Sequence, residues 1–300
     1  MARNIPAPFG NSSRLEITCY HSATFQWRET GVRVLDHDGG TGETLLGSED
    51  PPPVEVVRAG ASSPFLLTCE HAGKIFPKRL GTLGLDPTDV ERHITYDIGA
   101  AGVAKGLSRR LDAHLVLQTY SRLVVDCNRS PDAGDFIVTV SEATEIPGNR
   151  AVSGQQAKAR ADEIFHPYHD TIAAALDERE SSGRISVLVA VHSCTPVFHG
   201  VSRPWHVGVL YEHDARFAQI LLELLDDEGH LCVGDNEPYY MTSDKDYAAP
   251  VHGQNRGIPH VELEIRQDLI ETAQGQDEWA EFLAGILREG LGRMRETGHI

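Results

Sequence analysis

The feature that most constrains the fold is a nearly continuous apolar run at residues 185–191. A short run rich in β-branched residues is typical of a strand buried on both faces, and such strands occur mainly in parallel sheets covered by helices. Further strands are predicted at residues 65–69, 114–120, 206–211, 259–265 and near residue 231. The chain is therefore expected to form a central sheet.

Helical patterns alternate with these strands. Helices are predicted over residues 99–111, over a long segment at 153–181 that Pro167 should kink or split, and around the apolar stripes at 217–225 and 279–291. This alternation indicates an α/β fold, expected to be a three-layer α/β/α domain with a mixed, largely parallel central sheet. We assign this single domain to residues 45–300. Residues 1–44 show little periodicity and are expected to form an irregular N-terminal extension, with a short hairpin near residues 15–34.

The charge balance limits the partners of the chain. Asp and Glu outnumber Lys and Arg by 44 to 27, and the resulting net charge of -17 disfavours binding to nucleic acid or anionic lipid. No apolar run approaches the roughly 20 residues of a transmembrane helix, and the start of the chain lacks the pattern of a secretion signal. The five cysteines are widely spaced and are interpreted as reduced thiols. We therefore expect a cytoplasmic protein without nucleic-acid or membrane partners.

Histidines stand at the ends of two predicted strands. Glu70 and His71 follow the strand at 65–69, and His192 and Ser193 follow the run at 185–191. Because parallel strands bring their carboxyl ends to one edge of a sheet, both histidines are expected there. Two histidines, a carboxylate and an open position form the usual catalytic zinc set. A hydrogen-bonded structural role for each histidine is the alternative.

The strand predicted at 259–265 carries acidic residues at a spacing of two. Glu262, Glu264 and Arg266 should share one face of that strand. A buried, unpaired carboxylate is costly, so one of the two is expected to pair with Arg266 while the other is available for chemistry.

A second polar cluster lies at residues 121–130. Arg122, Asn128 and Arg129 provide the donors of a carboxylate clamp, because guanidinium groups present paired N–H donors. In an acidic chain such a cluster creates a local positive potential for a small anion. The alternative is that Arg129 pairs structurally with Asp126.

Several strings together resemble one enzyme family. They are EHAG at 70–73, YDIGA at 96–100, SRLVVDCNR at 121–129, PYH at 167–169, HS at 192–193, GDNEPY at 234–239 and EIRQDLI at 264–270. In this order, over roughly residues 45–295, they resemble the N-formylglutamate amidohydrolase family. That family is similar in fold to the zinc carboxypeptidases and aspartoacylases, in which a metal-bound water attacks an amide carbonyl and a strand-borne Glu acts as general base.

The resemblance implies a metal site with one zinc ion per chain. His71, Asp97 and His192 are the implied ligands. The carboxypeptidase pattern has Glu three residues after its first histidine, whereas this chain has Lys74 there. The second ligand must therefore lie elsewhere. Asp97 is preferred because the YDIGA string lies at a helix start in the resembling family, with Glu70 as the alternative.

The same resemblance implies roles for the other polar residues. Glu264 would be the general base and Arg122 would stabilise the oxyanion. Asn128 and Arg129 would bind the substrate's α-carboxylate. Arg266 would reach a side-chain carboxylate or pair with Glu262.

A few further residues complete the interpretation. Asn236 is a candidate substrate-binding residue. His169 and His252 are left out of the metal set and interpreted as structural or solvent-exposed. Ser193 lacks the GxSxG context of a nucleophile.

The function implied is zinc-dependent hydrolysis of the amide bond of N-formyl-L-glutamate or a related short N-acyl amino acid. One alternative is a deacylase for another N-acyl amino acid or small amide. Another is a noncatalytic protein that binds a small anion on the same fold.

Overall fold

The computed structural model describes residues 44–300, so the predictions for the N-terminal extension and its hairpin lie outside the described residues, residue 44 apart. The described chain contains a seven-stranded sheet with the strand order β1-β3-β2-β6-β11-β9-β10. Its strands are β1 (Val54–Val57), β2 (Phe65–Cys69), β3 (His114–Gln118), β6 (Val187–Cys194), β9 (Val207–Leu210), β10 (Val233–Asp235) and β11 (His260–Arg266). Two short hairpins lie outside it, β4 (Val140–Ser141) with β5 (Thr144–Glu145) and β7 (Val197–Phe198) with β8 (Val201–Ser202).

The sheet is mixed and mostly parallel. β3, β2, β6 and β11 run parallel to their neighbours in that order, and β10 is parallel to β9. β1 and β9 are antiparallel to β3 and β11. The α-helices are α1 (Pro87–Val90), α2 (Ala100–Leu111), α3 (Gly154–Arg160), α4 (His166–Ser181), α5 (Arg216–Asp227), α6 (Ala248–His252) and α7 (Ala273–Glu296). Single 3-10 turns occur at Lys78–Leu80, Pro147–Asn149, Gln254–Arg256 and Gln267–Leu269.

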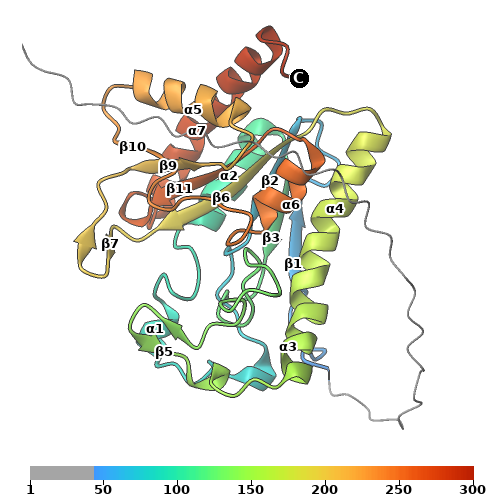
Figure 1. Ribbon diagram of the computed structural model, residues 1–300, viewed down its shortest axis with the longest axis vertical. Coiled ribbons are helices and arrows are strands. Elements are labelled where there is room, and N and C mark those ends of the chain that lie inside the picture. The colour runs from blue at the N-terminus through green and yellow to red at the C-terminus, as the bar shows by residue number, and fades with distance from the viewer. Residues whose placement is uncertain (1–43) are drawn as a thin grey trace, which may run out of the picture. The chain divides into compact units, whose positions relative to one another are not determined.

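Helices cover both faces of the sheet, as the alternation of strands and helices predicted. Phe65 and Leu67 of β2 pack with α2, α5 and α7 on one face, whereas Leu66 packs with α4 on the other. Figure 1 shows α4 and α6 on the opposite side of the strands from α2, α5 and α7. The three-layer α/β/α architecture with a largely parallel sheet is confirmed.

The alternation of side chains along two central strands positions the polar residues. Val191 of β6 and Leu263 of β11 belong to the core shared with α2, α5 and α7. His192 follows Val191, and Glu262 and Glu264 flank Leu263. These three side chains therefore point to the other face, near the carboxyl ends of both strands. His192 lies inside β6, because the strand extends to Cys194 instead of ending at residue 191.

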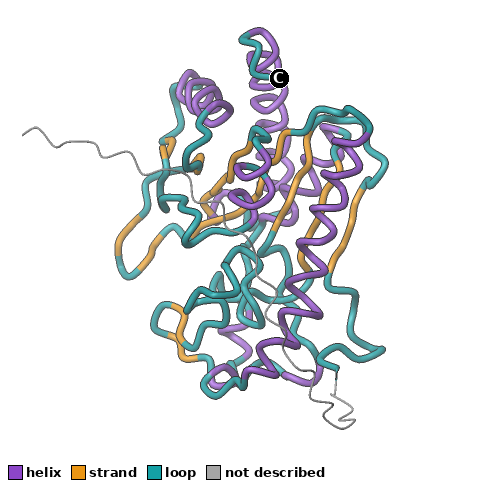
Figure 2. The backbone as a smooth tube through the Cα atoms, turned by 45° about the vertical axis from the view of Figure 1, so that its right-hand side comes forward, coloured by secondary structure: helices purple, strands orange, loops and turns teal. Residues whose placement is uncertain are grey.

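The long helical segment is neither split nor ended by Pro167. A π-helical stretch at Ala161–Phe165 joins α3 to α4, and Pro167 lies in the first turn of α4. Proline lacks an N–H and crowds the preceding turn, and the widened π turn lies just before it. The segments between β2 and α2 and between β3 and α3 consist mainly of loops, which Figure 2 shows as teal tube interrupted by α1 and by the β4–β5 hairpin.

Two other sequence expectations concern cysteines and membranes. Cys69, Cys127, Cys194 and Cys232 are free thiols in the described part of the chain. Within residues 44–300, no helix combines the length and apolar character needed to cross a bilayer.

Candidate active site

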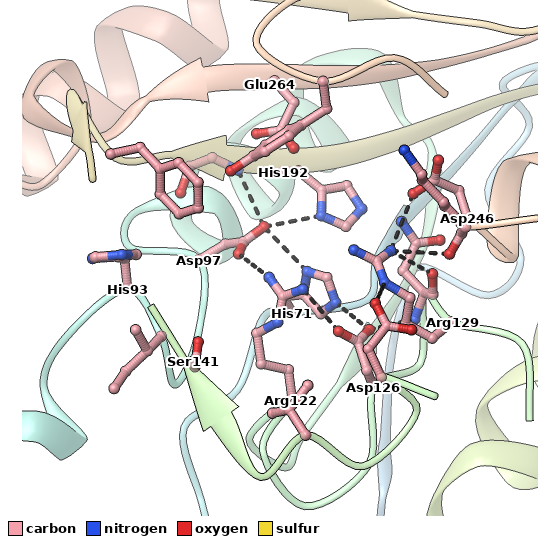
Figure 3. A pocket seen from close by; sticks show the side chains of 18 of the residues that line it. His71, His93, Asp97, Arg122, Asp126, Arg129, Ser141, His192, Asp246 and Glu264 are labelled. Atoms are coloured by element: carbon pink, nitrogen blue, oxygen red, sulfur yellow. Dashed lines mark hydrogen bonds and ion pairs between the residues drawn. The ribbon is translucent and has the colours of Figure 1, made fainter. Parts of the chain in front are cut away.

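A cavity of about 590 Å³ opens at the carboxyl ends of β2, β6 and β11. Ten of the residues named from the sequence line it: His71, Asp97, Arg122, Asp126, Asn128, Arg129, His192, Ser193, Glu262 and Glu264. Figure 3 shows His71, Asp97 and His192 near its centre, with Arg129 and Asp246 on one side and His93 and Ser141 on the other. The segments that carry these residues are far apart in the sequence, and the sheet edge brings them together.

Two glycines let the loops that carry His71 and Asp97 pack directly against neighbouring backbone. A Cβ atom on Gly73 would lie 1.8 Å from the carbonyl oxygen of Thr119. Gly99 has φ of 81°, and a Cβ atom there would lie 2.1 Å from the carbonyl oxygen of Ile270. A larger residue at either position would push its loop away from that backbone, which gives the glycines of the EHAG and YDIGA strings a steric reason.

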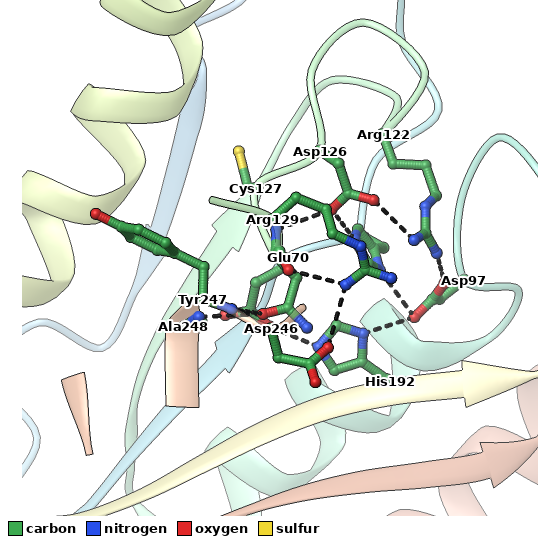
Figure 4. A network of polar contacts seen from close by, with 12 residues as sticks. Glu70, Asp97, Arg122, Asp126, Cys127, Arg129, His192, Asp246, Tyr247 and Ala248 are labelled. Carbon is green, nitrogen blue, oxygen red and sulfur yellow. Dashed lines mark hydrogen bonds and ion pairs between the residues drawn. The ribbon is translucent and has the colours of Figure 1, made fainter. Parts of the chain in front are cut away.

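The two histidines face Asp97 through the same ring atom. Nδ1 of His192 lies 2.9 Å and Nδ1 of His71 lies 3.5 Å from Oδ2 of Asp97. The opposite ring atoms contact other carboxylates: Nε2 of His71 lies 2.7 Å from Oδ1 of Asp126, and Nε2 of His192 lies 2.8 Å from Oε2 of Glu70. Figure 4 shows this network of carboxylates around His192. Each imidazole therefore directs Nδ1 toward Asp97.

This donor set fits a divalent cation. One ligand atom from each of His71, Asp97 and His192 lies within 4.8 Å of the others. Nδ1 of His71 is buried and makes no hydrogen bond to any residue in the range 44–300. Burial alone would lower the pKa of His192, but the carboxylates of Glu262, Asp97 and Glu70 raise it well above its usual value. An arrangement that stabilises positive charge and leaves an imidazole nitrogen unpaired suits a metal ion.

Glu70 occupies a different place from Asp97. Its Oε1 atom accepts a hydrogen bond from the Tyr168 hydroxyl at 3.0 Å, and its Oε2 atom lies against Nε2 of His192. Burial would raise the pKa of Glu70, but its hydrogen bond to His192 and the charge of that ring lower it to about 2. Glu70 thus remains ionised and orients His192 from the side that faces away from Asp97.

The two glutamates of β11 share one face, as their spacing predicts. Glu264 stands opposite His192 in the strand register, and both glutamates line the cavity. Burial raises the pKa of Glu262 to about 7 and that of Glu264 well above its usual value. The Oε2 atom of Glu264 is buried without a hydrogen-bond donor among the described residues. Glu264 is therefore a carboxyl group that is not held by protein donors, of the kind that active sites use for proton transfer.

Arg122 pairs with two of the carboxylates that contact the histidines. Its Nη2 atom donates to Oδ2 of Asp126 at 2.7 Å, and its Nη1 atom lies 3.5 Å from Oδ1 of Asp97. A quarter of its side chain (25%) remains exposed, and it lines the cavity. Burial would lower the pKa of this guanidinium, but Asp126 and Asp97 raise it, so the group carries a fixed charge.

Asn128 is held by protein contacts. Its Oδ1 atom accepts hydrogen bonds from the backbone N–H groups of Tyr247 and Ala248, at 3.1 and 3.0 Å. Its Nδ2 atom donates to Oε2 of Glu262 at 3.2 Å. The amide therefore presents its nitrogen, not its oxygen, toward the cavity.

Two of the three guanidinium nitrogens of Arg129 donate hydrogen bonds to protein groups. Its Nε atom donates to Asp135 at 3.0 Å and its Nη1 atom donates to Asp246 at 3.1 Å. Its Nη2 atom makes no hydrogen bond or ion pair within residues 44–300. The pairing with the Asp126 side chain that the sequence left open is not formed, because Asp126 pairs with Arg122 and His71.

Arg266 and Asn236 lie outside the lining of the cavity. Arg266 forms an ion pair with Asp268, in the turn that ends β11, so the expected pairing of Arg266 with Glu262 or Glu264 is wrong. The Oδ1 atom of Asn236 accepts from the backbone N–H of Tyr211 at 3.0 Å, so this side chain ties two loops together.

His169, His252 and Ser193 make structural contacts. Nδ1 of His169 lies 3.0 Å from Nε2 of His252, and Nε2 of His169 lies 2.8 Å from the carbonyl oxygen of Cys127. Both histidines are buried, and neither lines the cavity. The hydroxyl of Ser193 donates to the carbonyl oxygen of Ile98 at 2.8 Å.

Several lining residues had not been singled out from the sequence. They include His93, Glu142, Phe198, Lys245 and Asp246, whereas Tyr239, which also lines the cavity, belongs to the GDNEPY string. They lie in loops or in the short hairpins, where the sequence has no periodicity that would place them. Tyr239, whose pKa burial raises to about 12, accepts a hydrogen bond at its hydroxyl from Arg203 at 2.9 Å.

The chain matches known proteins over most of the described region. The sequence model of the N-formylglutamate amidohydrolase family matches residues 63–271. A gene product of Agrobacterium tumefaciens of known structure is 35% identical with a TM-score of 0.81, over 84% of this chain and 99% of that one. An N-formylglutamate amidohydrolase from Ralstonia eutropha JMP134 is 16% identical with a TM-score of 0.59, over 82% of this chain and 100% of that one. The comparison with curated proteins gave no match.

Proposed function

The chain belongs to the N-formylglutamate amidohydrolase family, and we propose that it is a zinc-dependent enzyme that hydrolyses the amide bond of N-formyl-L-glutamate or a related short N-acyl amino acid. The family makes it an amidohydrolase. The observation that carries the proposal is the group of His71, Asp97 and His192 beside the unpaired carboxylate of Glu264. We further propose that the enzyme acts in the cytoplasm on a small acidic substrate.

One zinc ion would be held by Nδ1 of His71, a carboxylate oxygen of Asp97 and Nδ1 of His192. Bound there, zinc would supply a Lewis acid that polarises a carbonyl and makes water more acidic. Asp126 and Glu70 support this role, because each holds the far nitrogen of one histidine and keeps Nδ1 directed at Asp97.

Glu264 is the proposed general base. Glu264 lines the cavity and its Oε2 atom has no donor within residues 44–300, so it can take a proton from the attacking water. The same carboxylic acid then delivers this proton to the departing amine nitrogen. A pKa raised by burial suits both steps, because the group must accept and release a proton in one turnover.

Arg122 and Arg129 are the proposed anion-binding residues. Arg122 would stabilise negative charge that develops on the carbonyl oxygen, because its charge is fixed beside the two histidines. The Nη2 atom of Arg129, with the amide nitrogen of Asn128 beside it, would bind the α-carboxylate. The proposed binding roles of Arg266 and Asn236 receive no support from their contacts with Asp268 and Tyr211.

A panel of small amides tests the substrate. N-formyl-L-glutamate, N-acetyl-L-glutamate, N-formyl-L-glutamine and formamide would be compared by release of the acid. We expect N-formyl-L-glutamate to have the highest kcat/KM and formamide, which lacks a carboxylate, to be at least about a hundredfold slower. Preference for another N-acyl amino acid would favour the alternative deacylase. Tight binding without hydrolysis would favour a noncatalytic anion-binding protein.

A further inference from the structure

Glu262 lines the cavity and has no role in the mechanism above. It lies on β11 with 3% of its surface exposed. Its Oε2 atom accepts one long hydrogen bond from Asn128, at 3.2 Å, and lies 3.9 Å from Nε2 of His192. Its Oε1 atom has no donor within the described chain. A buried carboxylate with so few donors is costly unless a ligand supplies another.

The neighbours of Glu262 cannot turn to supply that donor. The amide of Asn128 is fixed because its oxygen already accepts from two backbone N–H groups. The ring of His192 is fixed because Glu70 and Asp97 hold its two nitrogens. The free oxygen of Glu262 is therefore an acceptor built into the wall of the cavity.

Glu262 stands between the two ends of the site. His192, at 3.9 Å, belongs to the proposed metal-ligand group, and Asn128, at 3.2 Å, precedes Arg129 in the proposed carboxylate-binding pair. Figure 3 shows Arg129 beside the group that contains His71, Asp97 and His192. In an N-acyl amino acid, the amide nitrogen and Cα join the acyl carbonyl to the α-carboxylate. With the carbonyl and the carboxylate bound at these two ends, the group that faces Glu262 is the amide N–H.

We propose that Glu262 determines specificity by accepting a hydrogen bond from the N–H of the scissile amide, so that the site takes secondary amides and rejects tertiary ones. This inference rests on the proposed function. An N-alkyl group would remove the donor and leave the carboxylate unpaired. Sites built to bind a donor reject analogues that lack it by large factors, because their own polar group then loses its partner. The contact strengthens as the nitrogen becomes the amine of the product, since a cationic donor binds a carboxylate more tightly.

The test compares N-formyl-L-glutamate with N-formyl-N-methyl-L-glutamate. Wild type should prefer the secondary amide by at least about a hundredfold in kcat/KM. Glu262→Gln should reduce this preference at least tenfold, because Asn128 would engage the new amide oxygen and leave an NH₂ group facing the substrate N–H. Glu142→Gln is the matched control, since Glu142 lines the same cavity but pairs with Arg92. It should keep the wild-type preference.

Each outcome decides a separate point. The role of Glu262 is overturned if wild type hydrolyses both substrates similarly. It is also overturned if a folded, zinc-loaded Glu262→Gln variant keeps the wild-type preference. Neither result contradicts the proposed function. If wild type hydrolyses neither N-formyl-L-glutamate nor any other member of the amide panel, the proposed function is overturned and this inference with it. If Glu262→Gln does not fold, Glu262→Asp replaces it: the shorter carboxylate should lower the preference, and an unchanged preference overturns the role.

Discussion

Nδ1 of His192 lies 2.9 Å from Oδ2 of Asp97, which groups this carboxylate with the two histidines as candidate metal ligands. Glu70 meets the same ring at the other nitrogen. The sequence left Asp97 and Glu70 as alternatives for the second ligand. This geometry favours Asp97 and gives the two carboxylates different expected effects on metal binding.

Zinc affinity should separate these two carboxylates. Asp97→Ala should abolish stoichiometric zinc binding, because it removes a ligand. Glu70→Gln should weaken binding by about 10–100-fold, because it only loosens the orientation of His192. Competition with a chromophoric chelator measures both affinities. Asp135→Asn, which changes a cavity carboxylate that contacts neither histidine, serves as the control. Loss of zinc in Glu70→Gln with normal binding in Asp97→Ala would reverse the assignment.

Substitution of Arg122 should change kcat more than KM. Arg122→Met should lower kcat by about 10²–10³-fold, because it removes a fixed cation from the developing oxyanion. Arg122→Lys should recover part of the loss. Arg150→Met, which truncates an arginine whose side chain is 59% exposed, should leave kcat unchanged. A rise in KM alone would assign Arg122 to substrate binding instead.

The buried pair of His169 and His252 should make stability depend on pH. Burial lowers their pKa values to about 3 and about 4, so both are neutral in the folded protein near pH 5.5. The unfolded chain takes up protons below its histidine pKa of about 6.5. Stability is therefore fully present above about pH 6.5 and is lost as the pH falls toward about 4, by about 1.4 kcal/mol per histidine between pH 7.5 and 5.5.

Urea unfolding of the zinc-loaded protein at these two pH values checks this prediction. His169→Gln should reduce the loss of stability between pH 7.5 and 5.5 by about 1.4 kcal/mol relative to wild type. His213→Gln is the control, because the side chain of His213 is 79% exposed. An unchanged pH dependence in His169→Gln would show that this histidine does not remain neutral in the fold.

The sequence predicted the elements with strong local patterns. The strand at 65–69 and the helix that ends at Leu111 have the expected bounds, because apolar spacing and a following turn define them. β1 and the two short hairpins were not predicted, since two to four partly polar residues carry no periodicity.

The sequence could place side chains at a sheet edge but could not give their contacts. The spacing of two correctly put Glu262 and Glu264 on one face, whereas Arg266 is drawn away by Asp268 in the following turn. Nor could the sequence show that the oxygen of Asn128 is held by Tyr247 and Ala248, because these backbone groups lie 119 and 120 residues away.

The central claim is that Glu264 moves the proton of a zinc-dependent amide hydrolysis. The most direct measurement is formate release from N-formyl-L-glutamate by wild type and Glu264→Gln, each with its zinc content determined. We predict about one zinc ion per chain in both proteins and a fall in kcat of at least about 10²-fold in the variant. Turnover by a zinc-loaded Glu264→Gln variant at the wild-type rate, or full wild-type activity without zinc, would contradict the claim.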